Sequence, residues 1–176
     1  MTVFRLKPLP TSPATGLLVV NDHVVTRTRK ALLAFADPSG RRHEGLVFWA
    51  GRTIGANTYV LAAIAPQCDH GPYRVIADEE QMGAVARAAR ERGLGIVSEV
   101  HTHPDNDTRH SDGDDELVFM PFEGMFSLVI GNYGEGSLDP TRGAGLHQYQ
   151  NGRWIQVSNA ADVFRIVPAL IEIESV

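Results

Sequence analysis

Short apolar runs, separated by turn residues, recur along most of the chain and predict a β-sheet. The clearest runs cover residues 45–50, 59–65, 95–100 and 126–130. The first two are expected to form an antiparallel hairpin with a longish connection. Shorter extended pieces are expected over residues 17–20, 73–76, 146–150, 153–157 and 169–173.

Turn and breaker residues indicate how several of these pieces are joined. Asn151-Gly152 is typical of a two-residue hairpin turn, so it should join the flanking runs as antiparallel neighbours. Pro168 should separate a short helix from the final strand. At the other end, several prolines make residues 1–16 a loose leader.

Two longer segments carry the helical period instead. From Asp22, a residue suited to capping, apolar residues recur on one side until the turn at 37–40. Asp78 should cap a second helix that runs to about Arg92, with Gly93 as its stop. Helices and strands in this order predict the α/β (α+β) class, with one mixed β-sheet flanked by helices.

Composition adds limits on size, partners and location. The 176 residues suit one domain, 1–176, and the net charge of −5 argues against nucleic acid as a partner. Cys68 is the only cysteine, so no internal disulfide forms. The chain shows neither an apolar run long enough for a membrane span nor a signal-peptide pattern. We therefore expect a cytoplasmic protein.

The candidate chemistry is concentrated after the strand at 95–100. His101 and His103 are two residues apart, so on an extended strand their side chains point the same way. Ser111 should cap a short helix over about 112–119, which places Asp114 on the same helix face as Ser111. Two imidazoles and one carboxylate make a three-ligand metal site, which leaves zinc one open position for water.

The sequence His101-Thr102-His103-Pro104, followed by Ser111-Asp112-Gly113-Asp114, resembles the signature of the JAMM (MPN-plus, JAB-domain) zinc metalloproteases of prokaryotic type. Glu44 matches the glutamate that the family carries on an earlier strand. The motif core covers 44–131, and a C-terminal hairpin and tail cover 144–176. The resemblance implies the cytidine-deaminase-like architecture of JAB/MPN domains.

The resemblance also implies a mechanism and a substrate. One zinc ion per chain would be bound by His101, His103 and Asp114. Glu44 would act as general base, and Ser111 would donate a hydrogen bond to the oxyanion. The family hydrolyses the amide bond after the C-terminus of ubiquitin-like or sulfur-carrier proteins. The alternative is a metal-free MPN-type scaffold that binds proteins without cleaving them.

Two acidic residues compete with these assignments. Asp115 is the neighbour most easily mistaken for Asp114, and the alignment with Ser111 favours Asp114. Glu99 shares a strand face with His101 and so competes with Glu44, which the resemblance favours.

The remaining candidates are given ordinary roles. Trp49 and Trp154 are expected in the core, and Cys68 is not expected to act as a nucleophile. Ordinary surface positions are expected for the other histidines, which are His23, His43, His70, His110 and His147.

Overall fold

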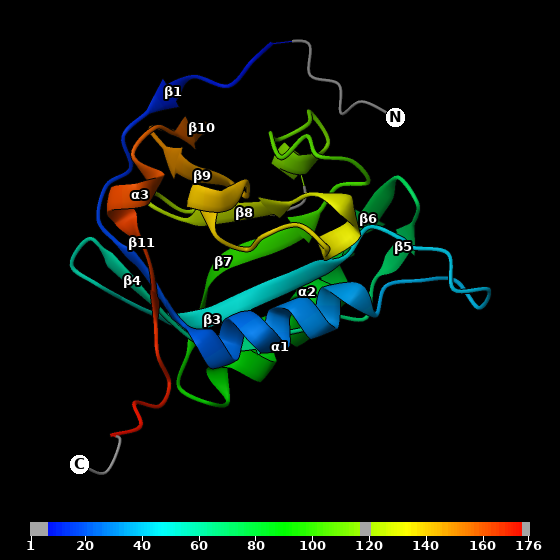
Figure 1. Cartoon of the computed structure of the whole chain (residues 1–176), viewed down its shortest axis with the longest axis horizontal. Coiled ribbons are helices and arrows are strands. Elements are labelled where there is room, and N and C mark those ends of the chain that lie inside the picture. Colours follow the sequence, from blue (N-terminus) through cyan, green and yellow to red (C-terminus); the bar gives the residue numbers. More distant parts are fainter. Residues whose placement is uncertain (1–6, 117–120, 174–176) are drawn as a thin grey trace.

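The computed structural model describes residues 7–116 and 121–173, and over these residues the main feature is a nine-stranded mixed sheet (Figure 1). The elements in chain order are β1 (Thr11–Ser12), β2 (Leu18–Asn21), α1 (Asp22–Leu33), β3 (Leu46–Ile54), β4 (Asn57–Ile64), β5 (Asp69–Gly71), β6 (Arg74–Ile76), α2 (Glu79–Arg90), β7 (Gly95–Thr102), β8 (Phe126–Ile130), β9 (Gly145–Gln150), β10 (Arg153–Val157), α3 (Ala160–Val163) and β11 (Phe164–Val167). The strand order in the sheet is β1-β10-β9-β8-β7-β3-β4-β2-β11, while β5 and β6 pair only with each other. The predicted mixed sheet flanked by helices is therefore confirmed.

The central strand β7 has an antiparallel neighbour on one side and a parallel neighbour on the other. On β3, Leu46 lies opposite His101, and on β8, Ser127 lies opposite Glu99. Strand β9 then runs antiparallel to β8, with His147 opposite Ser127. Glu99, Ser127 and His147 thus lie in one row across three strands.

Residues 46–51 of β3 are buried on both faces because the two long helices cover opposite sides of the sheet. Val47 and Trp49 belong to a buried cluster that includes α1 side chains. Leu46 and Phe48 belong to another cluster, with Val85 of α2. Since neighbouring residues on a strand face opposite ways, this division explains the unbroken apolar run.

Both helices begin where their capping residues predict, with one difference. The Asn21 side chain, rather than Asp22, accepts the 2.8 Å hydrogen bond from Val24 N and caps α1. Asp78 caps α2 in a reciprocal capping box with Gln81. Among the described residues, no helix combines the length and the apolar character that a membrane crossing requires.

The two predicted hairpins form, and one is tighter than expected. In β3–β4, pairing continues to Ile54 opposite Asn57, so the longish connection expected there is wrong. Strand pairing takes up most of that segment. In β9–β10, Asn151 and Gly152 have φ values of 52° and 77°, which suit the twist of a two-residue hairpin.

Three other predictions are corrected at the ends of the chain and after β7. In place of the helix expected over 112–119, the described part holds only a 3-10 turn, Asp114–Glu116, and 117–119 lie outside the described residues. The final strand is β11, which precedes Pro168 and pairs in parallel with β2, whereas 169–173 form no strand. Within the expected leader, β1 pairs in parallel with β10, and residues 1–6 lie outside the described residues.

Candidate metal centre

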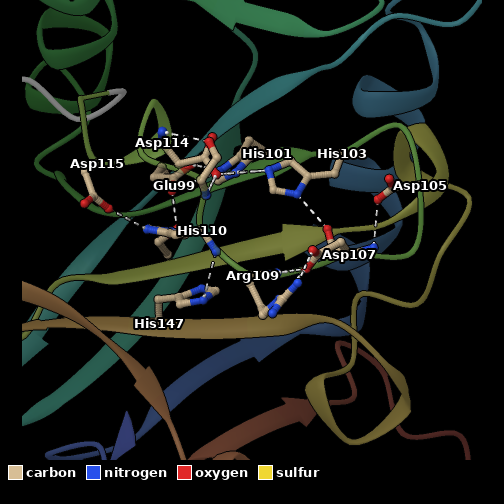
Figure 2. A network of polar contacts seen from close by, with 12 residues as sticks. Glu99, His101, His103, Asp105, Asp107, Arg109, His110, Asp114, Asp115 and His147 are labelled. Atoms are coloured by element: carbon tan, nitrogen blue, oxygen red, sulfur yellow. Dashed lines mark hydrogen bonds and ion pairs between the residues drawn. The ribbon is translucent and has the colours of Figure 1, made fainter. Parts of the chain in front are cut away.

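Two histidines at the end of β7 direct their Nε2 atoms to one point. His101 and His103 lie on either side of Thr102, and extended geometry sends both rings to the same face. Their Nε2 atoms are 3.3 Å apart, and the two residues are 1% and 2% exposed. Figure 2 shows both rings beside the carboxylate of Asp114. The side-chain alternation predicted for this strand therefore places them together.

Asp114 reaches the histidines from the loop that follows β7. Its Oδ2 lies 3.0 Å from His103 Nε2 and 3.5 Å from His101 Nε2. The same oxygen accepts a 2.5 Å hydrogen bond from Ser111 N, and Ser111 Oγ accepts a 3.3 Å hydrogen bond from Asp114 N. These two reciprocal hydrogen bonds hold the Asp114 carboxylate beside the histidines, the position expected from the predicted helix.

Each histidine is bonded through its other ring nitrogen to an acceptor. His103 Nδ1 donates to the Asp107 carbonyl oxygen at 2.7 Å, and His101 Nδ1 donates to Glu99 Oε2 at 3.0 Å. A nitrogen that donates in this way carries the hydrogen, so Nε2 keeps the lone pair in a neutral ring. Outer hydrogen bonds of this kind are typical of metal-binding histidines.

The three groups also perturb one another electrostatically. Burial lowers the pKa of His101, but the carboxylates of Glu99 and Asp114 outweigh it and raise that pKa well above its usual range. Burial raises the pKa of Asp114, but His101 and His103 hold that pKa well below its usual range. Positive charge is therefore strongly favoured at the point where the three side chains meet.

This arrangement fits a divalent metal ion. Tetrahedral sites with bonds of about 2.0–2.1 Å to nitrogen and oxygen place their ligand atoms about 3.3 Å apart. The separations of 3.0, 3.3 and 3.5 Å among the three ligand atoms agree with that spacing. His101, His103 and Asp114 thus form a buried cluster able to hold one metal ion.

Glu44 approaches this cluster from the chain before β3. Thr102 N donates to the Gly45 carbonyl oxygen at 3.0 Å, and Gly45 N donates to Thr102 Oγ1 at 2.8 Å, so this segment lies beside the end of β7. Burial raises the pKa of Glu44 to about 7, although His103 and His101 act to lower it. The Glu44 carboxyl group therefore interacts electrostatically with His101 and His103, and its pKa lies near neutral pH.

His110 and His147 are not surface histidines, and that expectation is wrong. They are 1% and 0% exposed, and their rings stack with centroids 4.0 Å apart. The burial of His147 could have been predicted from the hairpin turn. The turn places Trp154, an expected core residue, opposite Tyr149, and His147 lies on the same strand face as Tyr149. Trp154, like Trp49, is buried as predicted.

The other candidates have local roles. Asp115 Oδ1 lies 3.3 Å from His110 Nδ1, whereas the converging ligand atoms are those of His101, His103 and Asp114. Burial raises the pKa of Cys68 to about 11, so its thiol stays protonated at neutral pH. His23 is exposed as expected, whereas His43 and His70 are half-buried with their Nδ1 atoms 2.8 Å apart.

The fold and the sequence are both similar to those of known proteins. A solved structure from Desulfitobacterium hafniense is similar with a TM-score of 0.63 at 15% identity, over 88% of this chain and 95% of the other. One from Salinibacter ruber is similar with a TM-score of 0.55 at 19% identity, over 93% and 95%. No curated protein matches the sequence. The family described as prokaryotic homologs of the JAB domain matches residues 30–142, well over half of the chain, and the protein belongs to that family.

Proposed function

We propose that this protein is a zinc-dependent peptidase of the isopeptidase type. The observation that carries the proposal is the buried set of His101, His103 and Asp114, in which each imidazole is oriented through its other nitrogen. Membership of the JAB family supports the same chemistry. Three protein ligands leave zinc a further position, which is typical of catalytic sites rather than structural ones.

The chain's own residues supply the proton transfers and the oxyanion contact. A zinc ion held by His101, His103 and Asp114 would supply the Lewis-acid chemistry that favours hydrolysis by water near neutral pH. Glu44 accepts the proton of the attacking water and returns it to the leaving amine, roles that suit a carboxyl group with a pKa of about 7. Ser111, whose Oγ already accepts the Asp114 N–H, donates its hydroxyl hydrogen to the developing oxyanion.

The proposed substrate is the C-terminal tail of a ubiquitin-like or sulfur-carrier protein, cleaved in the cytoplasm. An extended tail binds by main-chain pairing to a strand edge, which tolerates small side chains. The bond that breaks is the amide between the terminal carboxyl of that protein and the amine attached to it.

The second candidate is a metal-free MPN-type scaffold that binds proteins without cleaving them. A scaffold has no need of a complete ligand set, so the presence of His101, His103 and Asp114 together favours the enzyme. The two functions differ most directly in the metal content of the purified protein.

Elemental analysis, followed by cleavage assays, tests the proposal. We expect about one zinc per chain, and release of C-terminal extensions from at least one member of a panel of ubiquitin-like fusions. A chelator should stop the cleavage and added zinc should restore it. Glu44→Gln should retain zinc but lose at least about 10²-fold in rate, while Glu80→Gln, on the exposed first turn of α2, should remain active. A protein without zinc, or cleavage unaffected by chelation, would contradict the proposal.

A further inference from the structure

A row of buried polar side chains crosses the sheet directly beside the metal centre. Glu99 on β7, Ser127 on β8 and His147 on β9 lie opposite one another in the strand pairing, and each is 0% exposed. Burying polar groups costs free energy unless they are hydrogen-bonded. A carboxylate, a hydroxyl and an imidazole in the middle of a sheet therefore call for an explanation beyond packing.

The hydrogen bonds in this row have a definite direction. The Glu99 carboxylate only accepts, and it receives hydrogen bonds from His101 Nδ1 on one side and from Ser127 Oγ on the other. Ser127 has then used its only hydrogen, so its oxygen accepts from His110 Nε2, 2.7 Å away. The series of donors therefore runs from His110 through Ser127 to Glu99, which also accepts the hydrogen of His101 Nδ1.

The far end of this series is also held firmly. The His110 ring stacks on His147 at an interplanar angle of 28° and meets the edge of Trp154 at a centroid distance of 5.1 Å. Its Nδ1 lies 3.3 Å from Asp115, the residue that follows the ligand Asp114. The adjacent residues Asp114 and Asp115 thus contact, respectively, the two histidine ligands and His110, the first donor of the series.

We infer that Glu99 is a positioning residue, which fixes His101 with the hydrogen on Nδ1 and the Nε2 lone pair directed to the metal. Ser127 and His110 are positioning residues that act through Glu99 by keeping its carboxylate oriented. The negative charge of Glu99 also strengthens the hydrogen bond from His101 and makes the imidazole a better ligand. This inference rests on the proposed function in one respect, that His101 binds zinc.

Zinc affinity of the full chain, measured by competition with a chelating dye, tests the inference without any substrate. Glu99→Gln keeps the shape and a hydrogen-bond acceptor but removes the charge, and it should weaken zinc binding about 10- to 100-fold. Ser127→Ala should weaken it less, about threefold to tenfold, because it removes only the support of Glu99.

Ser98→Ala is a matched control for Ser127→Ala. Ser98 is also 0% exposed and in the same sheet, but it lies opposite Phe126 and donates to the Phe126 carbonyl oxygen at 2.8 Å. As the neighbour of Glu99 on the strand, it faces the other side of the sheet. Its loss should leave zinc affinity unchanged within about twofold, even if it costs stability.

Nitrogen-15 NMR of the zinc-loaded protein reports the protonation and hydrogen bonding of His101 Nδ1. These would not change if Glu99 only contributed to packing. His101 should show a protonated Nδ1 whose hydrogen exchanges slowly and resonates far downfield, as a hydrogen bond to a carboxylate requires. In Glu99→Gln this resonance should move upfield, and in Ser98→Ala it should stay in place.

The outcomes separate the inference from the proposed function. Unchanged zinc affinity and an unchanged His101 Nδ1–H resonance in both Glu99→Gln and Ser127→Ala would overturn the inference while leaving the peptidase intact. Weakened zinc binding in these variants, with no cleavage of any substrate by the unchanged protein, would support the inference and contradict the proposed function. Failure of the unchanged protein to bind zinc would overturn both.

Discussion

Glu44 combines two properties that a general base at neutral pH requires. Its chain segment is bonded to Thr102, between the two histidines, and burial raises its pKa to about 7. A general base works best when its pKa is close to the pH at which the enzyme operates. The course of this segment and the raised pKa support the proposed role of Glu44 as general base.

The pH dependence of cleavage tests this role. Glu44 accepts a proton only when it is ionised, so kcat/KM should fall about tenfold per pH unit below the pKa of the free enzyme. A bound zinc ion adds positive charge, which favours the carboxylate, so the acid limb should lie at or below about 7. A profile with no acid limb, or with one above about pH 7, would contradict this role of Glu44.

His103→Ala separates a ligand from an ordinary histidine. Its Nε2 is 3.0 Å from Asp114 Oδ2, so truncation should abolish both zinc content and cleavage. His23→Ala is the control, because His23 is exposed on α1 and contacts Arg27 rather than the metal cluster. Zinc retained by His103→Ala at the level of the unchanged protein would refute the ligand set.

At the scale of elements, the site depends on how the loop after β7 packs against the sheet. A Cβ added at Gly145, the first residue of β9, would lie 1.8 Å from the Thr108 carbonyl oxygen. The loop between His103 and Asp114 thus rests directly on the backbone of β9. Only glycine permits this approach, because any side chain would push the loop away.

Gly145→Ala should therefore disturb the metal centre from a distance. Overpacking of this kind costs about 1–3 kcal/mol, and the displaced loop should also weaken zinc binding through Asp114. Gly95→Ala is the matched control, since a Cβ at this strand glycine meets nothing within 4 Å. Urea unfolding and dye competition measure the two effects. Equal stability and zinc affinity in both variants would show that the loop does not rest on Gly145 as described.

This packing also explains which parts of the site could be predicted from the sequence. His101 and His103 point the same way because side chains alternate along a strand. Their proximity could therefore be predicted from the sequence. The approach of Asp114 to the two histidines was predicted, but from a helix that does not form. A turn closed by hydrogen bonds between Ser111 and Asp114 positions the carboxylate instead. The burial of His110 depends on contacts between the loop and β9, which no local pattern encodes.

At the scale of the whole molecule, metal binding should be coupled to folding. The ligands are His101 of β7, His103 directly after β7, and Asp114 of the loop that lies against Gly145 of β9. Glu44 comes from the segment before β3. These elements meet only in the folded chain, so a metal ion held by the cluster stabilises the native state over the unfolded one.

Chelation should therefore lower the Tm of the protein by an amount that mass action fixes. With free zinc at about 100 times its Kd, the stabilisation is about 2.7 kcal/mol. For a chain of this size, 1 kcal/mol shifts Tm by about 2–4 °C, so zinc removal should lower Tm by roughly 5–11 °C. Differential scanning calorimetry with and without chelator measures the shift, and His103→Ala should show none. A shift of equal size in that variant would mean that the chelated metal binds elsewhere, because a stabilising ion must act through the residues that hold it.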